Sequence, residues 1–487
     1  MKILTLTPLL ILCIFISLQA QQSDPLQIDR KRAKIMESYI PDVIVQSTAL
    51  IEASDGNPRH ILVRGYTMPS NYFLMRFPVD AWNEKIFMDG CGLGCGTLPT
   101  DISGKLKKAL QRGYATATTN SGHWGTSIRD FTWAHNNRQA EIDFAHRAVH
   151  ETLRATTELV KAFYNRDPAL SYFWSCSNGG RQAVMTAALY PGDFDGVISE
   201  APVLDWSKLM ILYAWLRQTN TGPDRKDIIT RKDLALVSQL LYQECDKLDG
   251  KADGLIDDPS RCSFDLNSLR CQDGPDCLSP EKVEVLKKWY RGPENSKGEK
   301  VLAHGIALSS EPYWGWLLGA TDEAFDEFPP WDEFMQYITF QTDPGEHYSV
   351  YDFNFDEDPK KMTFMSDLLD ASHQSIQSYK DGGGKILMFH GIADPLVPYQ
   401  YSIDYFHRIN DLYGQETDDF FRLFLIPGMD HCSYQTQLGI SDQSVDPLSA
   451  LETWVEKDRA PDQLPVIQYL DDGSIKSRFS VSSYRDP

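Results

Sequence analysis

The residues of this chain that could do chemistry are a serine and a histidine that each have a cysteine as sequence neighbour. Ser177 follows Cys176, and His431 precedes Cys432 far along the chain. A serine hydroxyl is a weak nucleophile until a nearby imidazole removes its proton. A disulfide between the two cysteines would hold hydroxyl and imidazole together, so this pairing predicts a nucleophile at Ser177 with His431 as its base.

A carboxylate that could orient this imidazole is found at Asp394. It follows an apolar run at 385–390 and lies between Ser177 and His431 in the sequence. The order serine, acid, histidine is that of α/β-hydrolases, in which the acid fixes the imidazole tautomer and stabilises the imidazolium. A surface aspartate and a helix-capping histidine are the competing interpretation.

The sequence around Ser177 predicts a sharp turn between a strand at 170–174 and a helix at 179–189. In α/β-hydrolases this nucleophile elbow reads G-x-S-x-G, because small residues let the backbone close the turn. Here the five residues are Ser-Cys-Ser-Asn-Gly, with Ser175 in place of the first glycine. An ordinary turn is the alternative when these five residues are taken alone.

Acyl transfer also needs hydrogen-bond donors for the oxyanion of the tetrahedral intermediate. The amide of Asn178, directly after the nucleophile, is one expected donor. The glycine-rich segment 90–96 follows an apolar run at 85–90, and its Gly92 is the expected second donor. A phosphate-binding loop is the competing interpretation, but no Walker lysine follows and the spacing departs from G-x-G-x-x-G.

Apolar runs and helical patterns alternate along much of the chain, which predicts an α/β fold. Between the two alternating sections, the sequence is rich in aspartate, proline and aromatic residues and loses this alternation. We therefore expect an α/β-hydrolase core from residues 21–204 and 380–487, with an inserted lid domain at 205–379. The expected strands are 60–65, 72–79, 85–90, 114–119, 170–174, 385–390 and 421–426, and the expected helices are 140–164, 179–189 and 448–457.

The first 20 residues predict a cleavable export signal. Lys2 precedes an apolar run at 8–18, and the small residue Ala20 precedes Gln21. We therefore expect a secreted or periplasmic protein without a membrane anchor. The formal net charge of −21 repels phosphate backbones and anionic lipid surfaces, so nucleic acid and membrane are not expected partners.

Cysteine usage agrees with export to an oxidising compartment. Nine cysteines are present, and Cys13 lies within the predicted signal. The remaining eight are expected to form disulfides rather than free thiols. The close pairs Cys91 with Cys95, Cys245 with Cys262, and Cys271 with Cys277 are plausible, which would leave Cys176 for Cys432; other connectivities stay possible.

An acidic segment between Cys245 and Cys262 has a composition that suits a hard cation. Aspartates recur every three or four residues among glycines, and calcium prefers carboxylate and carbonyl oxygens. The spacing is not that of an EF-hand, and a solvated acidic loop is the alternative. His146 and His150 lie four residues apart but lack a third ligand, so zinc is not expected. Nine aromatic residues between Tyr313 and Phe340 could line an acyl pocket or simply build a core.

Several of these motifs together resemble the tannase and feruloyl esterase family, which also contains mono(2-hydroxyethyl) terephthalate hydrolase. The resemblance covers nearly the whole chain after the signal. It is carried by segments 172–182, 194–202, 390–398, 430–432 and 454–461. Ser175 and the pair Cys91 and Cys95 in the glycine-rich segment depart from the family pattern.

The resemblance implies a serine esterase for esters of aromatic acids, such as hydroxycinnamates or gallates, either small or linked to plant polymers. It implies the triad Ser177, Asp394 and His431, with Cys176 bonded to Cys432. It also implies a structural calcium ion in the lid, bound by the side chains of Asp246, Asp249 and Asp253 and the carbonyls of Lys251 and Leu255. The alternatives are a calcium-stabilised, non-catalytic binding protein on the same scaffold and a peptidase of the same fold.

Overall fold

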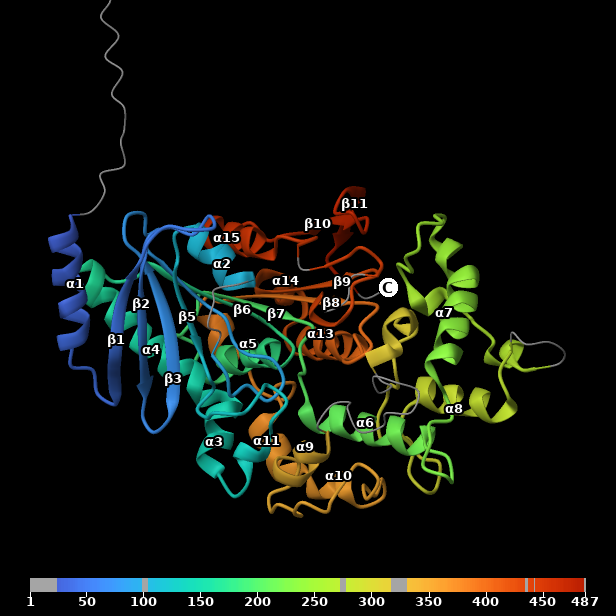
Figure 1. Ribbon diagram of the computed structural model, residues 1–487. Coiled ribbons are helices and arrows are strands. Elements are labelled where there is room, and N and C mark those ends of the chain that lie inside the picture. The colour runs from blue at the N-terminus through green and yellow to red at the C-terminus, as the bar shows by residue number, and fades with distance from the viewer. Residues whose placement is uncertain are drawn as a thin grey trace, which may run out of the picture.

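A central sheet with helices on both faces and a helical region beside it make up the molecule (Figure 1). The computed structural model describes residues 24–98, 104–271, 277–316, 331–433, 437–441 and 443–485. The predicted export signal lies outside the described residues.

The described residues form a nine-stranded sheet in the order β1-β2-β3-β5-β4-β6-β7-β8-β9. Strands β1, β2, β3 and β5 pair antiparallel in that order, whereas β5, β4, β6, β7, β8 and β9 run parallel. This mostly parallel sheet is the α/β architecture that the sequence predicts. The strands are β1 (Val43–Ile51), β2 (His60–Thr67), β3 (Asn71–Pro78), β4 (Lys85–Met88), β5 (Ala115–Thr119), β6 (Leu170–Cys176), β7 (Gly196–Glu200), β8 (Lys385–Gly391) and β9 (Phe421–Ile426).

The helices cover both faces of this sheet, and a separate two-stranded sheet of β10 (Gln463–Tyr469) and β11 (Ile475–Ser482) follows near the C-terminus. Helices α2 and α15 lie on one face, and α4, α5 and α13 lie on the other (Figure 1). The helices of the core are α1 (Pro25–Glu37), α2 (Gly104–Gln111), α3 (Arg138–Ile142), α4 (Ala148–Tyr164), α5 (Asn178–Leu189), α12 (Gln377–Asp381), α13 (Gln400–Tyr413), α14 (Thr417–Phe420) and α15 (Pro447–Lys457).

Side-chain alternation along the strands builds one hydrophobic core on each face. In β6, Tyr172 and Trp174 belong to the core under α2 and α15, whereas Phe173 belongs to the core under α4 and α5. The same division holds in β8, where Leu387 and Met388 lie in different cores. A sheet buried on both faces is rigid, and its strand ends are therefore firm supports for loops.

The chain between β7 and β8 contributes no strand to the sheet within the described residues. It forms α6 (Trp206–Asn220), α7 (Arg231–Cys245), α8 (Pro280–Arg291), α9 (Trp331–Tyr337), α10 (Asp358–Lys361) and α11 (Thr363–Leu369). These helices lie to the right of and below the sheet in Figure 1 and pack around a hydrophobic core largely of their own. The loss of alternation in the sequence corresponds to this helical segment.

One predicted element differs from the structure. The sequence predicts a single helix over 140–164, but α3 and α4 are joined by a π-helical turn at Asp143–Arg147. A π-helical turn moves its carbonyls out of the α-helical pattern, and such turns are frequent at functional sites. Here the carbonyls of Phe144 and Ala145 accept hydrogen bonds from the Arg181 guanidinium of α5.

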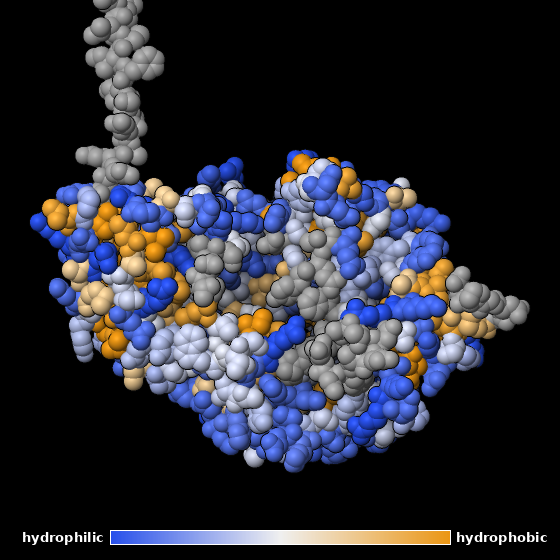
Figure 2. Space-filling view, in the orientation of Figure 1, coloured by the Kyte–Doolittle hydropathy of each residue, from blue (hydrophilic) through white to orange (hydrophobic). Residues whose placement is uncertain are grey.

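Hydrophilic residues make up most of the face shown in Figure 2, and hydrophobic ones gather over α1 and β1–β3 at the left. Within the described residues, no helix has the length and apolar character needed to cross a bilayer.

Candidate active site

Ser177 lies in a sharp turn between β6 and α5, as predicted. Its backbone has φ 63° and ψ −123°, a conformation that a residue with a side chain rarely adopts. The turn is tight: a Cβ on Gly179 would lie 1.9 Å from Ser175 Oγ, and one on Gly180 would lie 2.5 Å from the Glu200 carbonyl oxygen. This crowding explains why small residues occupy the positions around Ser177.

Ser175, which occupies the position of the first glycine in the nucleophile elbow, contacts a neighbouring carboxylate. The Ser175 hydroxyl donates a hydrogen bond to the carboxylate of Asp89 at the end of β4. Burial raises the pKa of Asp89 to about 6, although nearby Lys105 and this hydrogen bond favour the charged form. Ser175 therefore fits the turn in size and places a hydroxyl against a half-buried acid.

Asp394 and His431 lie in the loops that follow β8 and β9, and the structure brings their side chains together. The distance from His431 Nδ1 to Asp394 Oδ2 is 2.7 Å, and both residues are buried. Asp394 Oδ1 accepts the backbone amides of Leu396 and Val397 at 2.8 and 2.9 Å. The acid is thus held by its own loop while its other oxygen contacts the imidazole.

The electrostatics of this pair favour the charged carboxylate. Burial alone would raise the pKa of Asp394. The charge of His431 and the hydrogen bonds from His390 and His431 outweigh the effect of burial, so the pKa of Asp394 is lowered. Burial would lower the pKa of His431, but the charge and hydrogen bond of Asp394, with the charges of Asp430 and Glu200, raise it above its ordinary value. Asp394 is therefore ionised wherever His431 titrates.

A disulfide joins the loop of Ser177 to that of His431. Cys176 and Cys432 are bonded, with their Cα atoms 5.9 Å apart. Adjacent Cα atoms are about 3.8 Å apart, so the Cα atoms of Ser177 and His431 lie within about 14 Å of each other. The other disulfides within the described residues join Cys91 to Cys95, Cys245 to Cys262 and Cys271 to Cys277, which are the predicted pairs.

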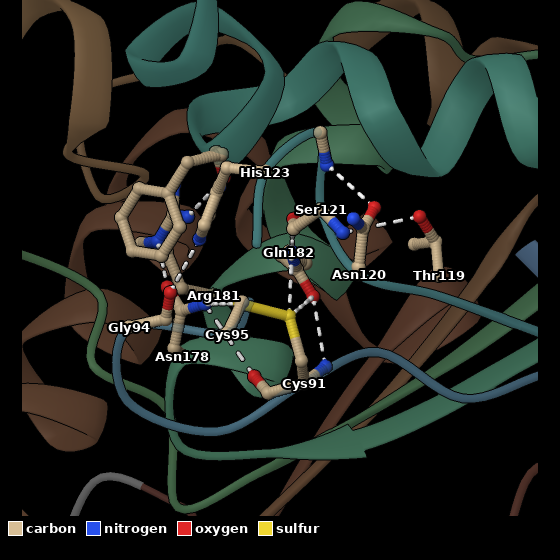
Figure 3. The surroundings of a disulfide bond; sticks show 12 residues. Cys91, Gly94, Cys95, Thr119, Asn120, Ser121, His123, Asn178, Arg181 and Gln182 are labelled. Carbon is tan, nitrogen blue, oxygen red and sulfur yellow. Dashed lines mark hydrogen bonds between the residues drawn. A yellow bond between two sulfur atoms is a disulfide. The ribbon is translucent and has the colours of Figure 1, made fainter. Parts of the chain in front are cut away.

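The glycine-rich loop that contains Gly92 is held against α5, the helix that follows Ser177 (Figure 3). Asn178 Nδ2 donates to the Cys91 carbonyl at 3.4 Å, and the Cys91 amide donates to Gln182 Oε1 at 3.3 Å. The Cys91–Cys95 disulfide closes this loop. Asn178 is the first residue of α5, where a backbone amide has no acceptor within the helix. The two predicted donors therefore belong to segments in direct contact.

Arg181 was not predicted as a site residue, yet it organises the surroundings of Asn178. Its Nε donates to Asn178 Oδ1 at 2.8 Å, while its other nitrogens donate to the carbonyls of Phe144, Ala145 and Leu369. Burial lowers the pKa of Arg181 to about 9. A buried arginine bound mainly to carbonyls cannot be inferred from sequence, because its acceptors come from the π-helical turn and from α11.

The predicted calcium ligands lie in the loop that follows α7. Asp246 Oδ1 accepts the amides of Gly254 and Leu255, and Asp249 Oδ1 accepts that of Lys251. Asp249 Oδ2 is buried without a hydrogen-bond donor among the described residues and lies 3.7 Å from Lys251 Nζ. No group of three or more His, Cys, Asp or Glu within the described residues is arranged closely enough to hold a metal.

The chemistry of this loop nevertheless fits a hard cation. Burial and contact with the Asp249 carboxyl raise the pKa of Asp257. Two carboxylates in contact repel each other unless a proton or a cation offsets their charge, and Lys251 Nζ, 3.3 Å from Asp257 Oδ2, supplies one positive charge here. Carboxylate and carbonyl oxygens are the donors that calcium prefers.

The aromatic residues predicted either to line a pocket or to build a core mostly do the latter. Tyr313, Trp314, Trp331 and Phe334 are at most 5 % exposed, and the last three belong to the core of the helical segment. Phe325 and Phe328 lie outside the described residues.

The chain is similar to proteins of one known family. The family described as "Tannase and feruloyl esterase" matches residues 59–482. Mono(2-hydroxyethyl) terephthalate hydrolase of Piscinibacter sakaiensis is 30% identical, covering 80% of this chain and 74% of the relative. Feruloyl esterase B of Aspergillus niger is 28% identical, covering 76% of this chain and 72% of the relative.

Solved structures show the same fold. The crystal structure of feruloyl esterase B from Aspergillus oryzae matches with a TM-score of 0.80 at 23% identity, covering 93% of this chain and 96% of that one. Tannin acyl hydrolase from Aspergillus niger matches with a TM-score of 0.75 at 17% identity, covering 93% and 91%. With the family match spanning most of the chain, this protein belongs to the tannase and feruloyl esterase family of carboxylic ester hydrolases.

Proposed function

We propose that this protein is a secreted serine esterase that cleaves esters of aromatic acids through an acyl-serine intermediate. The observation that carries the proposal is the pair of links at His431. The imidazole of His431 makes a 2.7 Å hydrogen bond with Asp394. Its neighbour Cys432 forms a disulfide with Cys176, the residue before Ser177. A serine in a strained strand-to-helix turn, tied through this disulfide to an imidazole that contacts a buried carboxylate, suits acyl transfer.

In the acylation step, His431 Nε2 accepts the proton of Ser177 as Oγ attacks the ester carbonyl. The amides of Asn178 and Gly92 donate hydrogen bonds to the resulting oxyanion. His431 then gives this proton to the leaving alcohol, and the acyl group remains on Ser177. Asp394 stays ionised throughout and stabilises the imidazolium.

In the deacylation step, His431 removes a proton from water, which attacks the acyl-serine carbonyl. The same two amides bind the second oxyanion. The proton on His431 returns to Ser177 Oγ as the acid leaves. Each step uses the same base and the same donors, so one arrangement serves both halves of the reaction.

The aromatic acyl group is proposed from the relatives. Feruloyl esterases and a terephthalate monoester hydrolase act on esters of aromatic acids by their names. A hydroxycinnamate or gallate ester, free or linked to a plant polymer, is the proposed substrate. Export is proposed from residues 1–20 and supported by the disulfides, which are typical of proteins in oxidising compartments.

A structural calcium ion is proposed in the loop after α7. The side chains of Asp246, Asp249 and Asp253 and the carbonyls of Lys251 and Leu255 would hold it. Bound there, the ion would neutralise the clustered carboxylates and stabilise the helical segment. It takes no part in the proposed reaction.

Replacing Ser177 with alanine should abolish ester hydrolysis, because no other residue of the site supplies the nucleophile. On a panel of methyl ferulate, methyl gallate, a terephthalate monoester and aliphatic esters, we expect turnover of an aromatic ester by the wild type and at least about a 1000-fold loss in Ser177→Ala. The exposed Ser474→Ala variant is the control. Turnover of peptides but not esters would instead indicate a peptidase, and ligand binding without any turnover would indicate a binding protein.

Activity should fall at acidic pH as His431 becomes protonated, because the imidazolium cannot accept the Ser177 proton. Since the pKa of His431 is raised, the acid limb of kcat/KM should have its midpoint above about 6.5. Asp430→Asn removes a negative charge near His431 and should move this limb to lower pH. An equal shift in the remote Asp472→Asn variant, or none in Asp430→Asn, would contradict the assignment of the limb to His431.

Breaking the Cys176–Cys432 disulfide should lower the kcat of the protein that remains folded. In a Cys176→Ala, Cys432→Ala double variant, the loops of Ser177 and His431 lose their covalent link, and we expect kcat to fall at least about 10-fold in folded protein. The Cys271→Ala, Cys277→Ala variant is the matched control and should keep most of its kcat. Thermal denaturation measures the folded fraction of each, and equal kcat values in the two variants would show that the first bridge only stabilises the fold.

Removing calcium should lower the thermal stability of the protein, because the carboxylates of the loop would then repel one another. After chelation and verified metal loss, we expect the melting temperature to fall by several degrees and to recover when calcium is added. Asp249→Asn should abolish this response, whereas Asp367→Asn, an exposed change on α11, should keep it. A melting temperature that is insensitive to metal removal would rule out the site.

A further inference from the structure

A second histidine contacts the carboxylate of Asp394. His390, in β8, is fully buried, and its Nε2 lies 3.1 Å from Asp394 Oδ2 and 3.0 Å from the carbonyl oxygen of Val397. A carbonyl and an ionised carboxylate only accept hydrogen bonds, so Nε2 must carry a hydrogen. On the other side of the ring, Nδ1 lies 2.8 Å from the hydroxyl of Ser402 in α13.

This contact completes the hydrogen bonding of the acid. Oδ1 accepts the amides of Leu396 and Val397, and Oδ2 accepts the imidazoles of His431 and His390. An ionised carboxylate has about four acceptor sites, so every site of Asp394 is used. The carboxylate cannot rotate away from His431 without breaking other bonds in a buried setting, where each broken bond is costly.

We propose that His390 is a positioning residue for ester hydrolysis: its Nε2–H holds Asp394 Oδ2 in place and shares that oxygen with His431. This inference rests on the proposed function, in which Asp394 orients the base. His390 donates a hydrogen bond to the same carboxylate oxygen as His431. This hydrogen bond stabilises part of the negative charge of Asp394, so the carboxylate attracts the His431 imidazolium less strongly. His390 thereby fixes the geometry of the acid and limits how strongly the acid raises the proton affinity of the base.

Other charged and titratable groups face this cluster. Asp430, beside His431 in the loop after β9, and Glu200, at the end of β7, both raise the pKa of His431. From α6, Tyr213 lies near Asp394, and its hydroxyl donates to the Leu396 carbonyl at 2.9 Å. Lys105 of α2 pairs with Glu200 at 2.8 Å. None of these groups changes in the variants below, so a shift of the pH profile reports on His390.

The test compares His390→Leu, which removes the donor, with His390→Gln, which keeps an N–H group near the position of Nε2. For His390→Leu we expect kcat/KM to fall by up to about 100-fold and its acid limb to move to higher pH, because Asp394 then acts on His431 alone. For His390→Gln we expect most of the activity and the wild-type midpoint. Ser402→Ala leaves both acceptors of Nε2 in place and should lose little activity without a shift.

Nuclear magnetic resonance of the wild type provides a measurement that does not depend on whether a variant folds. Nitrogen-15 spectra should show the hydrogen of His390 on Nε2, and the low-field proton between His431 Nδ1 and Asp394 Oδ2 should move in folded His390→Leu. A His390 hydrogen found only on Nδ1 would overturn the proposal. So would a folded His390→Leu enzyme with an unmoved midpoint and resonance. Activity that survives Ser177→Ala would instead overturn the proposed function.

Discussion

The covalent link between Cys176 and Cys432 is the constraint on which the rest of the site depends. In the sheet, β6 and β9 are separated by β7 and β8, so these strands lie about 14 Å apart at a spacing of about 4.8 Å. The Cα atoms of the two cysteines are only 5.9 Å apart. Because Cys176 is the last residue of β6, the loop after β9 must reach back over the ends of β7 and β8, where the loop that contains Asp394 begins.

Two buried charged groups near this convergence, Asp394 and Arg181, each have several hydrogen-bond partners, and this pairing fixes the site. The buried charge of Asp394 accepts four hydrogen bonds, and Arg181 donates to three carbonyls and to Asn178. An unpaired group in such a setting is costly, so these contacts hold α5, the π-helical turn and α11 in one arrangement. The rigidity that preorganised catalysis requires comes from this network and from the sheet beneath it.

Much of the fold and the pairing of the cysteines could be predicted from the sequence. Apolar runs gave β9 at Phe421–Ile426 and placed β6 and α5 on either side of Ser177, because burial on both faces of a parallel sheet leaves a strong local pattern. The edge strand β1, the short β7 and the hairpin of β10 and β11 were missed. The hairpin did carry a signal, since Asp472 and Gly473 form a turn between alternating apolar and polar residues. The roles of His390 and Arg181 could not be predicted, because their partners are set by tertiary contacts.

We propose that Ser177 is a nucleophile and that His431, whose loop is joined to it by the Cys176–Cys432 disulfide, activates it. Mass-spectrometric mapping of the protein after reaction with a fluorophosphonate tests this claim most directly. We predict a single modified residue, Ser177, with a rate that rises with pH as His431 loses its proton and that collapses when the protein is unfolded. Modification at another residue, or a Ser177 no more reactive in the folded protein than in the denatured chain, would contradict it.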